Sequence, residues 1–111
     1  MARILAFAPD LFFASKIEET LTAAGHQVTL ASREDELEMA EGPDLVIVDL
    51  DASGPTAPDV GEGAPLLGFY SHVEVDTRRS AEAAGYDLVV PRSRMSREMP
   101  ELVARLVGSG G

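Results

Sequence analysis

Two carboxylates follow an apolar run in the stretch DLVIVDLD, residues 44–51. Leu45 to Val48 are all apolar, and Asp49 and Asp51 come directly behind them. A carboxylate at the end of a buried strand could accept a phosphoryl group or contribute to a cation site. The simpler interpretation is that the strand ends here and that acidic residues are common in loops. Residues elsewhere in the chain must decide between these alternatives.

Further polar groups follow other apolar runs in the same way. They are Asp10, the pair Ser71–His72 and the tripeptide Arg92–Ser93–Arg94. Together with Asp49 or Asp51, His72 could form a metal site or an acid–base pair, or it could hydrogen-bond a loop carbonyl. The pair Arg92–Ser93 could bind an anion such as a phosphate. We favour the alternative that Arg92 forms an ion pair with Asp49 or Asp10.

The elements that must position these groups are predicted from apolar runs and from helix-end signals. We predict strands at Arg3–Ala8, His26–Ala31, Leu45–Val48, Leu66–Tyr70 and Tyr86–Val90. Helices are predicted from the N-cap Asp10 up to the terminating Gly25, over residues 32–40, over Asp76–Ala84 before the terminating Gly85, and from a cap at Ser96 or Met99 to Val107, with Pro100 tolerated in the first turn. Phe7, Phe12, Phe13 and Phe69 are predicted to lie in the core. The run Leu45–Val48 does not alternate with polar residues, which indicates a strand covered on both faces of a parallel sheet.

Residues 51–65 form the least regular connection. The stretch DASGPTAPDVGEGAP contains three prolines and three glycines, which oppose a helix of several turns. We therefore predict an irregular or only briefly helical crossover. One face of the sheet would then be less covered, and an exposed apolar strip there would be a candidate surface for a dimer or a partner.

The composition restricts the classes of protein to which this chain can belong. Its 111 residues have room for one domain, which we place at residues 1–107, with a flexible tail at 108–111. The chain has no cysteine, which excludes disulfides, thiolate metal sites and cysteine catalysis and is compatible with a cytoplasmic protein. Its formal net charge of −10 would repel nucleic-acid backbones and anionic membranes, so we expect neither as a direct partner.

The order of the elements and the string PDLVIVDLD resemble the receiver domain of bacterial response regulators. The resemblance extends from Arg3 to Val107: RILAFAPD corresponds to the first strand of that family, PLLGFYS to the fourth and AAGYDLVVPRS to the fifth. It implies a flavodoxin-like (CheY-like) α/β fold, a doubly wound five-stranded parallel sheet in the order 2-1-3-4-5, here with a shortened or irregular third crossover. It also places Asp49 at the phosphoacceptor position of two-component signal transduction.

The resemblance also implies that charged groups of the family site are replaced. The acidic pair that would hold Mg²⁺ corresponds to Ala8 and Pro9, or to Pro9 and Asp10 with a shift of one residue. The lysine that would contact the phosphoryl group corresponds to Pro91 or Arg92. A divalent cation needs several oxygen ligands, and phosphoryl transfer to a carboxylate needs such a cation to neutralise the charge.

Residues at the switch positions differ from the family as well. The hydroxyl at the end of the fourth strand corresponds to Tyr70 or Ser71, and His72 follows directly. The aromatic position of the fifth strand corresponds to Leu88 or Val89, and neither is aromatic. Both the chemistry and the conformational switch of the family are therefore altered in this sequence.

Three functional hypotheses follow. The first is a pseudo-receiver, a non-enzymatic module without metal or other cofactor that binds a protein partner or a second copy of itself. Asp49 would then lie in an ion-pair or hydrogen-bond network, with Arg92 as its expected partner. The second is an active receiver, phosphorylated on Asp49 with Mg²⁺. The third is a flavodoxin-like domain that binds a small anion through Arg92, Ser93 and His72; the absence of a glycine-rich phosphate-binding motif argues against nucleotides.

Overall fold

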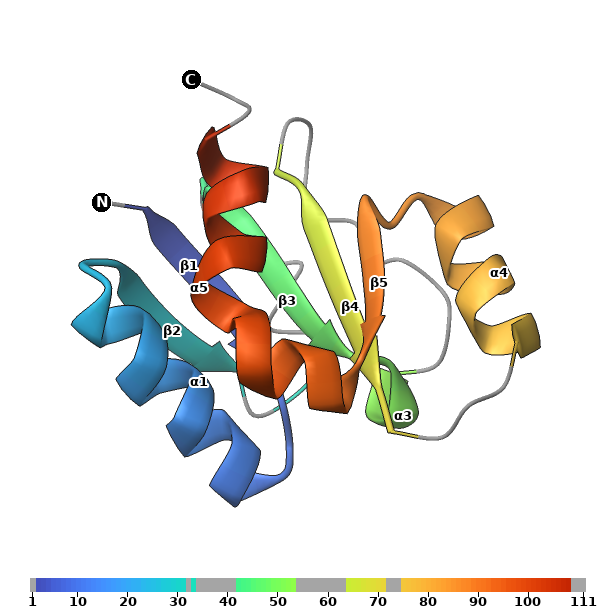
Figure 1. Cartoon of the computed structure of the whole chain (residues 1–111), viewed down its shortest axis with the longest axis horizontal. Helices are drawn as coiled ribbons and strands as arrows, with labels where there is room; N and C mark the ends of the chain where they lie inside the picture. The colour runs from blue at the N-terminus through green and yellow to red at the C-terminus, as the bar shows by residue number, and fades with distance from the viewer. Residues whose placement is uncertain (1, 32, 34–41, 54–63, 72–74, 109–111) are drawn as a thin grey trace.

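The apolar run at the centre of the chain forms the middle strand of a parallel sheet (Figure 1). The structure is a computed structural model that describes residues 2–31, 33, 42–53, 64–71 and 75–108. The strands of the sheet are β1 (Arg3–Phe7), β2 (Gln27–Ala31), β3 (Leu45–Asp49), β4 (Leu66–Tyr70) and β5 (Leu88–Pro91). Every neighbouring pair is parallel and the order is β2-β1-β3-β4-β5, which confirms the predicted topology.

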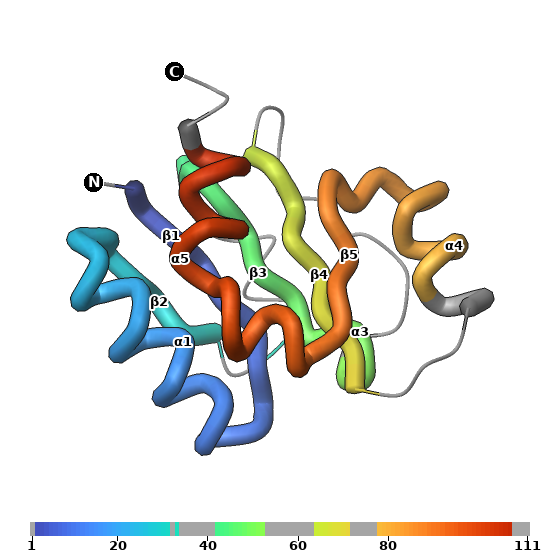
Figure 2. Tube along the Cα trace, in the orientation of Figure 1, coloured from blue at the N-terminus to red at the C-terminus, as the bar shows by residue number. Residues whose placement is uncertain are grey.

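Helices lie on both faces of this sheet. They are α1 (Leu11–Ala23), α3 (Leu50–Ser53), α4 (Val75–Ala84) and α5 (Arg92–Gly108). The tube in Figure 2 shows α1 and α5 side by side across one face of the sheet, where their side chains share one core cluster. Residues of α3 and α4 belong to a second cluster on the opposite face. The helix predicted over residues 32–40 lies outside the described residues, except for Arg33.

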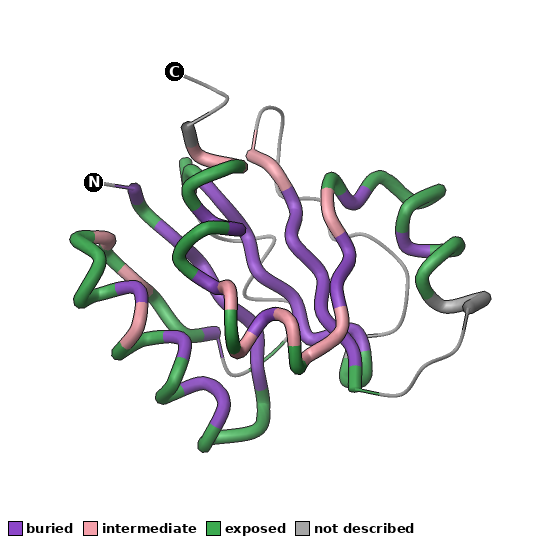
Figure 3. Tube along the Cα trace, viewed as in Figure 1, coloured by how far each residue is buried: buried purple, intermediate pink, exposed green. Residues whose placement is uncertain are grey.

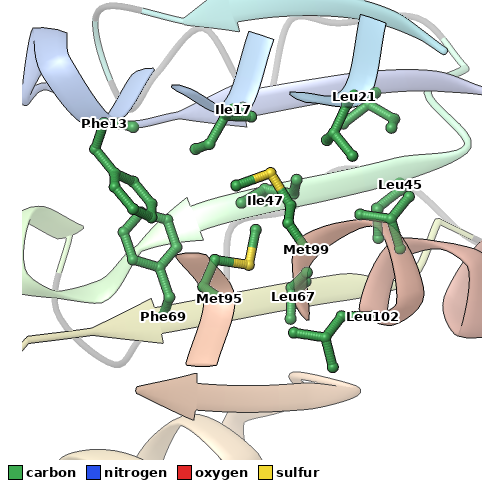
Figure 4. Packing of buried hydrophobic residues seen from close by; sticks show 14 of the residues in the cluster. Phe13, Ile17, Leu21, Leu45, Ile47, Leu67, Phe69, Met95, Met99 and Leu102 are labelled. Carbon is green, nitrogen blue, oxygen red and sulfur yellow. The ribbon is translucent and has the colours of Figure 1, made fainter. Parts of the chain in front are cut away.

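Alternate residues of β3 serve the two clusters. Leu45 and Ile47 pack toward α1 and α5, whereas Val46 and Val48 pack toward the opposite face, and all four are fully buried. Figure 3 shows this central burial, and Figure 4 shows Ile47 among the side chains that α1 and α5 contribute. A strand covered on both faces has no reason to alternate apolar with polar residues, which explains the sequence pattern.

One predicted core residue is not in the core. Phe12 is 92% exposed, whereas its neighbour Phe13 is buried. Asp10 caps α1 through hydrogen bonds from the backbone N–H groups of Phe12 and Phe13, and this start fixes the direction of every side chain on the helix. The buried positions are then Phe13, Ala14, Ile17 and Leu21, and Phe12 points away from the sheet.

The last helix begins earlier than the sequence indicated. Our prediction was a start at Ser96 or Met99, but α5 begins at Arg92, directly after β5. Glu98 has non-helical angles (φ −119°, ψ 17°), so two helical segments meet at a kink there. Pro100 lies just after the kink, and proline breaks a continuous helix because it has no N–H to donate and its ring clashes with the carbonyl four residues before it. The sequence prediction recovered only the second segment.

The connection after β3 is briefly helical where the structure describes it. α3 extends over only four residues, Leu50–Ser53, as expected for a stretch rich in proline and glycine. Residues 54–63 lie outside the described part, so the rest of this prediction is untested. The apolar strip that we expected on this face is not present among the described strand residues, because Val46, Val48 and Tyr70 are buried there.

None of the described helices is long and apolar enough to cross a lipid bilayer.

Gly68 in β4 offers a test of the packing on the face that carries α3. A Cβ atom at this position would lie 3.0 Å from Leu50 Cδ1 and 3.1 Å from Tyr86 Cδ1. Gly68→Ala should therefore lower the free energy of unfolding by about 1–3 kcal/mol, as overpacked cores do, in a urea titration. Leu50→Ala should cost less in the Gly68→Ala background than in the wild type, because it removes the clash. Additive effects would contradict this packing.

Candidate functional site

Polar side chains from four strand ends meet at one edge of the sheet. Because all strands are parallel, their carboxyl ends lie together, at the arrowheads in Figure 1. Asp10 follows β1, Asp49 ends β3, Ser71 follows β4 and Arg92 follows β5. In open α/β sheets this edge is where ligands bind. We therefore take this group of residues as the candidate site.

An ion pair joins the end of β1 to the end of β5. Arg92 donates a hydrogen bond from its terminal nitrogen to Asp10 Oδ2 at 2.6 Å, across 82 positions of sequence. The other oxygen, Asp10 Oδ1, accepts from the backbone N–H groups of Phe12 and Phe13 at 3.0 and 3.4 Å. The guanidinium, more than these amides, lowers the pKa of Asp10. Both oxygens of this carboxylate are thus occupied by protein donors.

The same guanidinium contacts the core. The Cζ atom of Arg92 lies 4.3 Å from the centre of the Phe13 ring, and that ring lies 4.9 Å from the ring of Phe69. Arginine attracts an aromatic face by a cation–π interaction, and its planar group suits this position better than lysine would. Arg92 is therefore fixed both by charge and by packing.

Asp49 is the one buried charged residue among those described, with 6% of its surface exposed. Its Oδ1 accepts a hydrogen bond from the backbone N–H of Asp51 at 3.0 Å, and the N–H of Ala52 also contributes. Burial raises the pKa of Asp49 above its ordinary value, and the negative charge of Asp51 adds to this effect. The expected ion pair between Asp49 and Arg92 is absent, because the guanidinium contacts Asp10 instead and acts on Asp49 only through space.

Asp51 connects the end of β3 to the end of β4. Its Oδ2 accepts a hydrogen bond from the backbone N–H of Ser71 at 2.8 Å and another from the Ser71 hydroxyl. The sequence placed both residues at strand ends but gave no sign that they bind each other. The only available signal was the adjacency of β3 and β4, which follows from the predicted strand order.

The remaining predicted site residues are spread around this edge. Tyr70 is buried in the cluster that faces α3 and α4. Ser93 is exposed in the first turn of α5, where its carbonyl accepts from Arg97 Nε at 3.4 Å, and Arg94 pairs with Glu98. His72 lies outside the described residues. Ser93 and Arg94 thus belong to a helix and not to a strand-end loop.

The residues at this edge do not fit a magnesium ion well. Mg²⁺ requires near-octahedral oxygen ligands and gives up water reluctantly. Asp10 already has both oxygens engaged, and the positions before it are Ala8, which is buried, and Pro9. Within the described residues, no three Asp, Glu or His side chains are grouped so that they could hold a metal ion.

The fold is the flavodoxin-like fold of response regulator receiver domains. A CheY-like receiver domain protein from Methanospirillum hungatei JF-1 is 16% identical, with a TM-score of 0.83, and 99% of this chain and 96% of that one are covered. The receiver domain of the Francisella response regulator 1452 is 14% identical, with a TM-score of 0.80 and both chains covered fully. NtrX from Brucella abortus, solved with ADP, is 18% identical with a TM-score of 0.84, and the match covers 98% of this chain and 26% of NtrX.

At these identities the likeness establishes the fold alone. No family model and no curated protein matches the sequence.

Asp49→Asn should raise the melting temperature at pH 7 by a few degrees. The amide oxygen can still accept from Asp51 N–H, and the variant no longer buries a charge. Because the pKa of Asp49 is raised in the folded state, its stabilising contribution is present in acid and is lost as the pH rises through that pKa. The gain should therefore vanish below about pH 4. Glu101→Gln, an exposed control on α5, should show little change at either pH.

Arg92→Ala should lower the melting temperature, and the Phe13 contact alone is worth about 0.5–1 kcal/mol. The pKa of Asp10 is lowered by Arg92, so the pair stabilises the protein at neutral pH and is lost as the pH falls through that lowered pKa. The difference between wild type and variant should consequently shrink in acid. Arg79→Ala on α4 removes an exposed arginine away from the site and should have little effect at any pH.

Proposed function

We propose that this chain is a non-enzymatic signalling module that acts by binding another protein. We further propose that its receiver-like site no longer takes up a phosphoryl group with Mg²⁺. The shared fold with receiver domains supports a place in signal transduction. The composition supports a protein as the partner, because a net charge of −10 disfavours nucleic acid.

The observation that carries the proposal is the Arg92–Asp10 ion pair. In a cluster of carboxylates that binds a cation, the bound cation neutralises the negative charges. When the cation is absent, the carboxylates repel one another. Here a guanidinium supplies positive charge permanently, at 2.6 Å from Asp10. Bringing Mg²⁺ to Asp10 would require breaking this pair and the contact of Arg92 with Phe13. The site therefore has its counter-ion built into the chain.

The surroundings of Asp49 support the same interpretation. Asp49 is only 6% exposed, and its Oδ1 already accepts a hydrogen bond from the backbone N–H of Asp51, so little of this carboxylate is open to an incoming phosphoryl group. The two alternatives place different demands on the same groups. An active receiver needs Asp49 together with a cation, and an anion-binding domain needs Arg92 available, although Arg92 is engaged with Asp10. The cation would also have to displace Arg92 from Asp10, and an anion would have to compete with Asp10 for Arg92.

The test is a titration with millimolar Mg²⁺ and beryllofluoride, a mimic of the phosphoryl group, followed by amide NMR shifts. We expect no saturable shift at the amides of Asp49, Asp51 and Ser71, because the cation lacks ligands. The control is Asp49→Asn, whose spectrum should respond to these additions in the same way as the wild type.

A saturable shift in the wild type that Asp49→Asn abolishes would show a functioning phosphoacceptor site and would overturn the proposal. A melting temperature that Mg²⁺ raises in the wild type but not in the variant would lead to the same conclusion.

A further inference from the structure

Strand β2 forms one outer edge of the sheet and lacks the features that usually protect such an edge. The two edge strands are β2 and β5 (Figure 1). β5 has four residues and ends in Pro91, and proline cannot donate a hydrogen bond to an added strand. β2, with the sequence QVTLA, is one residue longer and contains no charge, no proline and no bulge in its register with β1. An edge of this kind is open to pairing with a further strand.

The backbone groups of Val28 and Leu30 point outward from this edge. The Gln27 N–H donates to the carbonyl of Ala2 at 2.9 Å, so Gln27 and every second residue after it face β1. The two residues between them face away from β1. Within the part of the chain that the structure describes, neither Val28 nor Leu30 has a backbone hydrogen-bond partner. Two N–H groups and two carbonyl groups are therefore offered to an incoming strand.

A shallow depression lies beside this edge, between β2 and α1. The residues that line it are Glu18, Glu19, Thr22, Ala23 and Val28. Leu30 is 36% exposed and points to the same face of the sheet as Val28, since alternate side chains of a strand share a face. A strand added along β2 would direct every second side chain toward α1. Those side chains would meet the apolar residues of β2 and the carboxylates of α1 together.

The charge next to the edge is negative. Glu18 and Glu19 are both exposed, and no described cation forms an ion pair with either. Lys16, earlier on α1, donates to Ser96 Oγ of α5 at 2.5 Å. Arg33 comes after the end of β2 and has a contact of its own. A segment that pairs with β2 would therefore gain from positive side chains, and the net charge of −10 on the whole chain favours the same sign.

We infer that β2 accepts an extended basic segment of another protein, which adds a sixth strand to the sheet at this edge. On the face toward α1, the segment places an apolar side chain against Val28 and Leu30 and an arginine or lysine within reach of Glu18 or Glu19. Backbone hydrogen bonds hold such a strand, and its alternate side chains select it. This inference rests on the proposal that the chain acts by binding a protein, and it specifies the surface and the chemistry of the partner.

A second copy of this chain fits the edge less well than a basic segment does. Pairing two copies through β2 would place two chains, each with a net charge of −10, against one another. A nucleic acid or an anionic membrane would be repelled for the same reason. Neither of them supplies the regularly spaced amide donors and carbonyl acceptors that the edge of a sheet binds.

The experiment uses a fluorescently labelled peptide of about seven residues, roughly 23 Å when extended, with the sequence VTRTVTR. Valine and arginine then share one face of the strand. One matched peptide carries Glu in place of every Arg. In a second matched peptide every backbone N–H is N-methylated, so that the side chains are unchanged but the peptide cannot donate to a strand edge. We expect saturable binding of the first peptide to the full chain by fluorescence anisotropy, and no saturable binding of either matched peptide.

Hydrogen exchange followed by NMR locates the contact. In the free chain the amides of Val28 and Leu30 should exchange quickly, whereas those of Thr29 and Ala31, which face β1, should exchange slowly. When nine-tenths of the chain is bound, exchange at Val28 and Leu30 should slow by about tenfold, because only the free tenth exchanges.

Variants beside the edge have matched controls. Glu18→Gln combined with Glu19→Gln should weaken binding by about fivefold and reduce its dependence on salt, whereas Glu101→Gln on α5 should not. Leu30→Thr should weaken binding because it removes an apolar contact, whereas Thr29→Ala, on the opposite face of the same strand, should change binding little. Circular dichroism of each variant shows whether the fold is retained, and the N-methylated peptide tests the inference without any change to the chain.

Several outcomes would overturn the inference. They are slow exchange at Val28 and Leu30 in the free chain, equal binding of either matched peptide, and protection that maps away from β2. Protection of the same amides that rises with protein concentration in the absence of peptide would assign the edge to a second copy and would also overturn it.

The beryllofluoride titration is independent of these results. Absence of peptide binding with a negative titration would reject the strand-addition site alone. A positive titration would reject the proposed loss of phosphorylation, whatever the peptide does.

Discussion

The carboxylates at the C-terminal edge of the sheet lie close together, and hydrogen bonds and an ion pair offset the repulsion between their charges. Asp10 is neutralised by Arg92, Asp49 is hydrogen-bonded to backbone amides, and Asp51 binds Ser71. Each of these three contacts uses a different donor. Each one joins two strand ends, or a strand end to the start of a helix. The parallel order of the sheet creates this problem, because every strand delivers its last residue to one edge. The site chemistry thus follows directly from the topology.

Much of the fold could be predicted because burial leaves a periodic signal in the sequence. The run Leu45–Val48 does not alternate with polar residues, and this pattern predicted β3 as a buried strand. The predicted strand order is confirmed as well. The start of α5 could not be predicted in the same way. The first segment of α5, residues 92–98, is mostly polar, so it lacks an apolar face that is easy to recognise. Met95 is its one buried residue. The predicted start at Ser96 or Met99 therefore falls next to the kink at Glu98.

The site was predicted less completely than the fold, for a physical reason. Residue types identify which groups meet at an edge but not which donor each acceptor selects, since this depends on distances below 4 Å. Arg92 was expected to pair with Asp49 or Asp10, and the sequence could not decide between them; the structure has the pair with Asp10, with the guanidinium also over the Phe13 ring. Phe12 was assigned to the core because aromatic residues usually are buried, and only the exact start of α1 turns it outward.

The Arg92–Asp10 contact has a consequence for how the protein is made. The contact joins positions 82 residues apart, so the carboxylate that caps α1 waits for its partner until most of the chain has left the ribosome. During synthesis the early strands and α1 exist while Arg92 is still in the exit tunnel. Asp10 is then without the counter-ion that it has in the folded protein. The emergence of α5 supplies that counter-ion, so the Arg92–Asp10 contact can form only after all five strands have been synthesised.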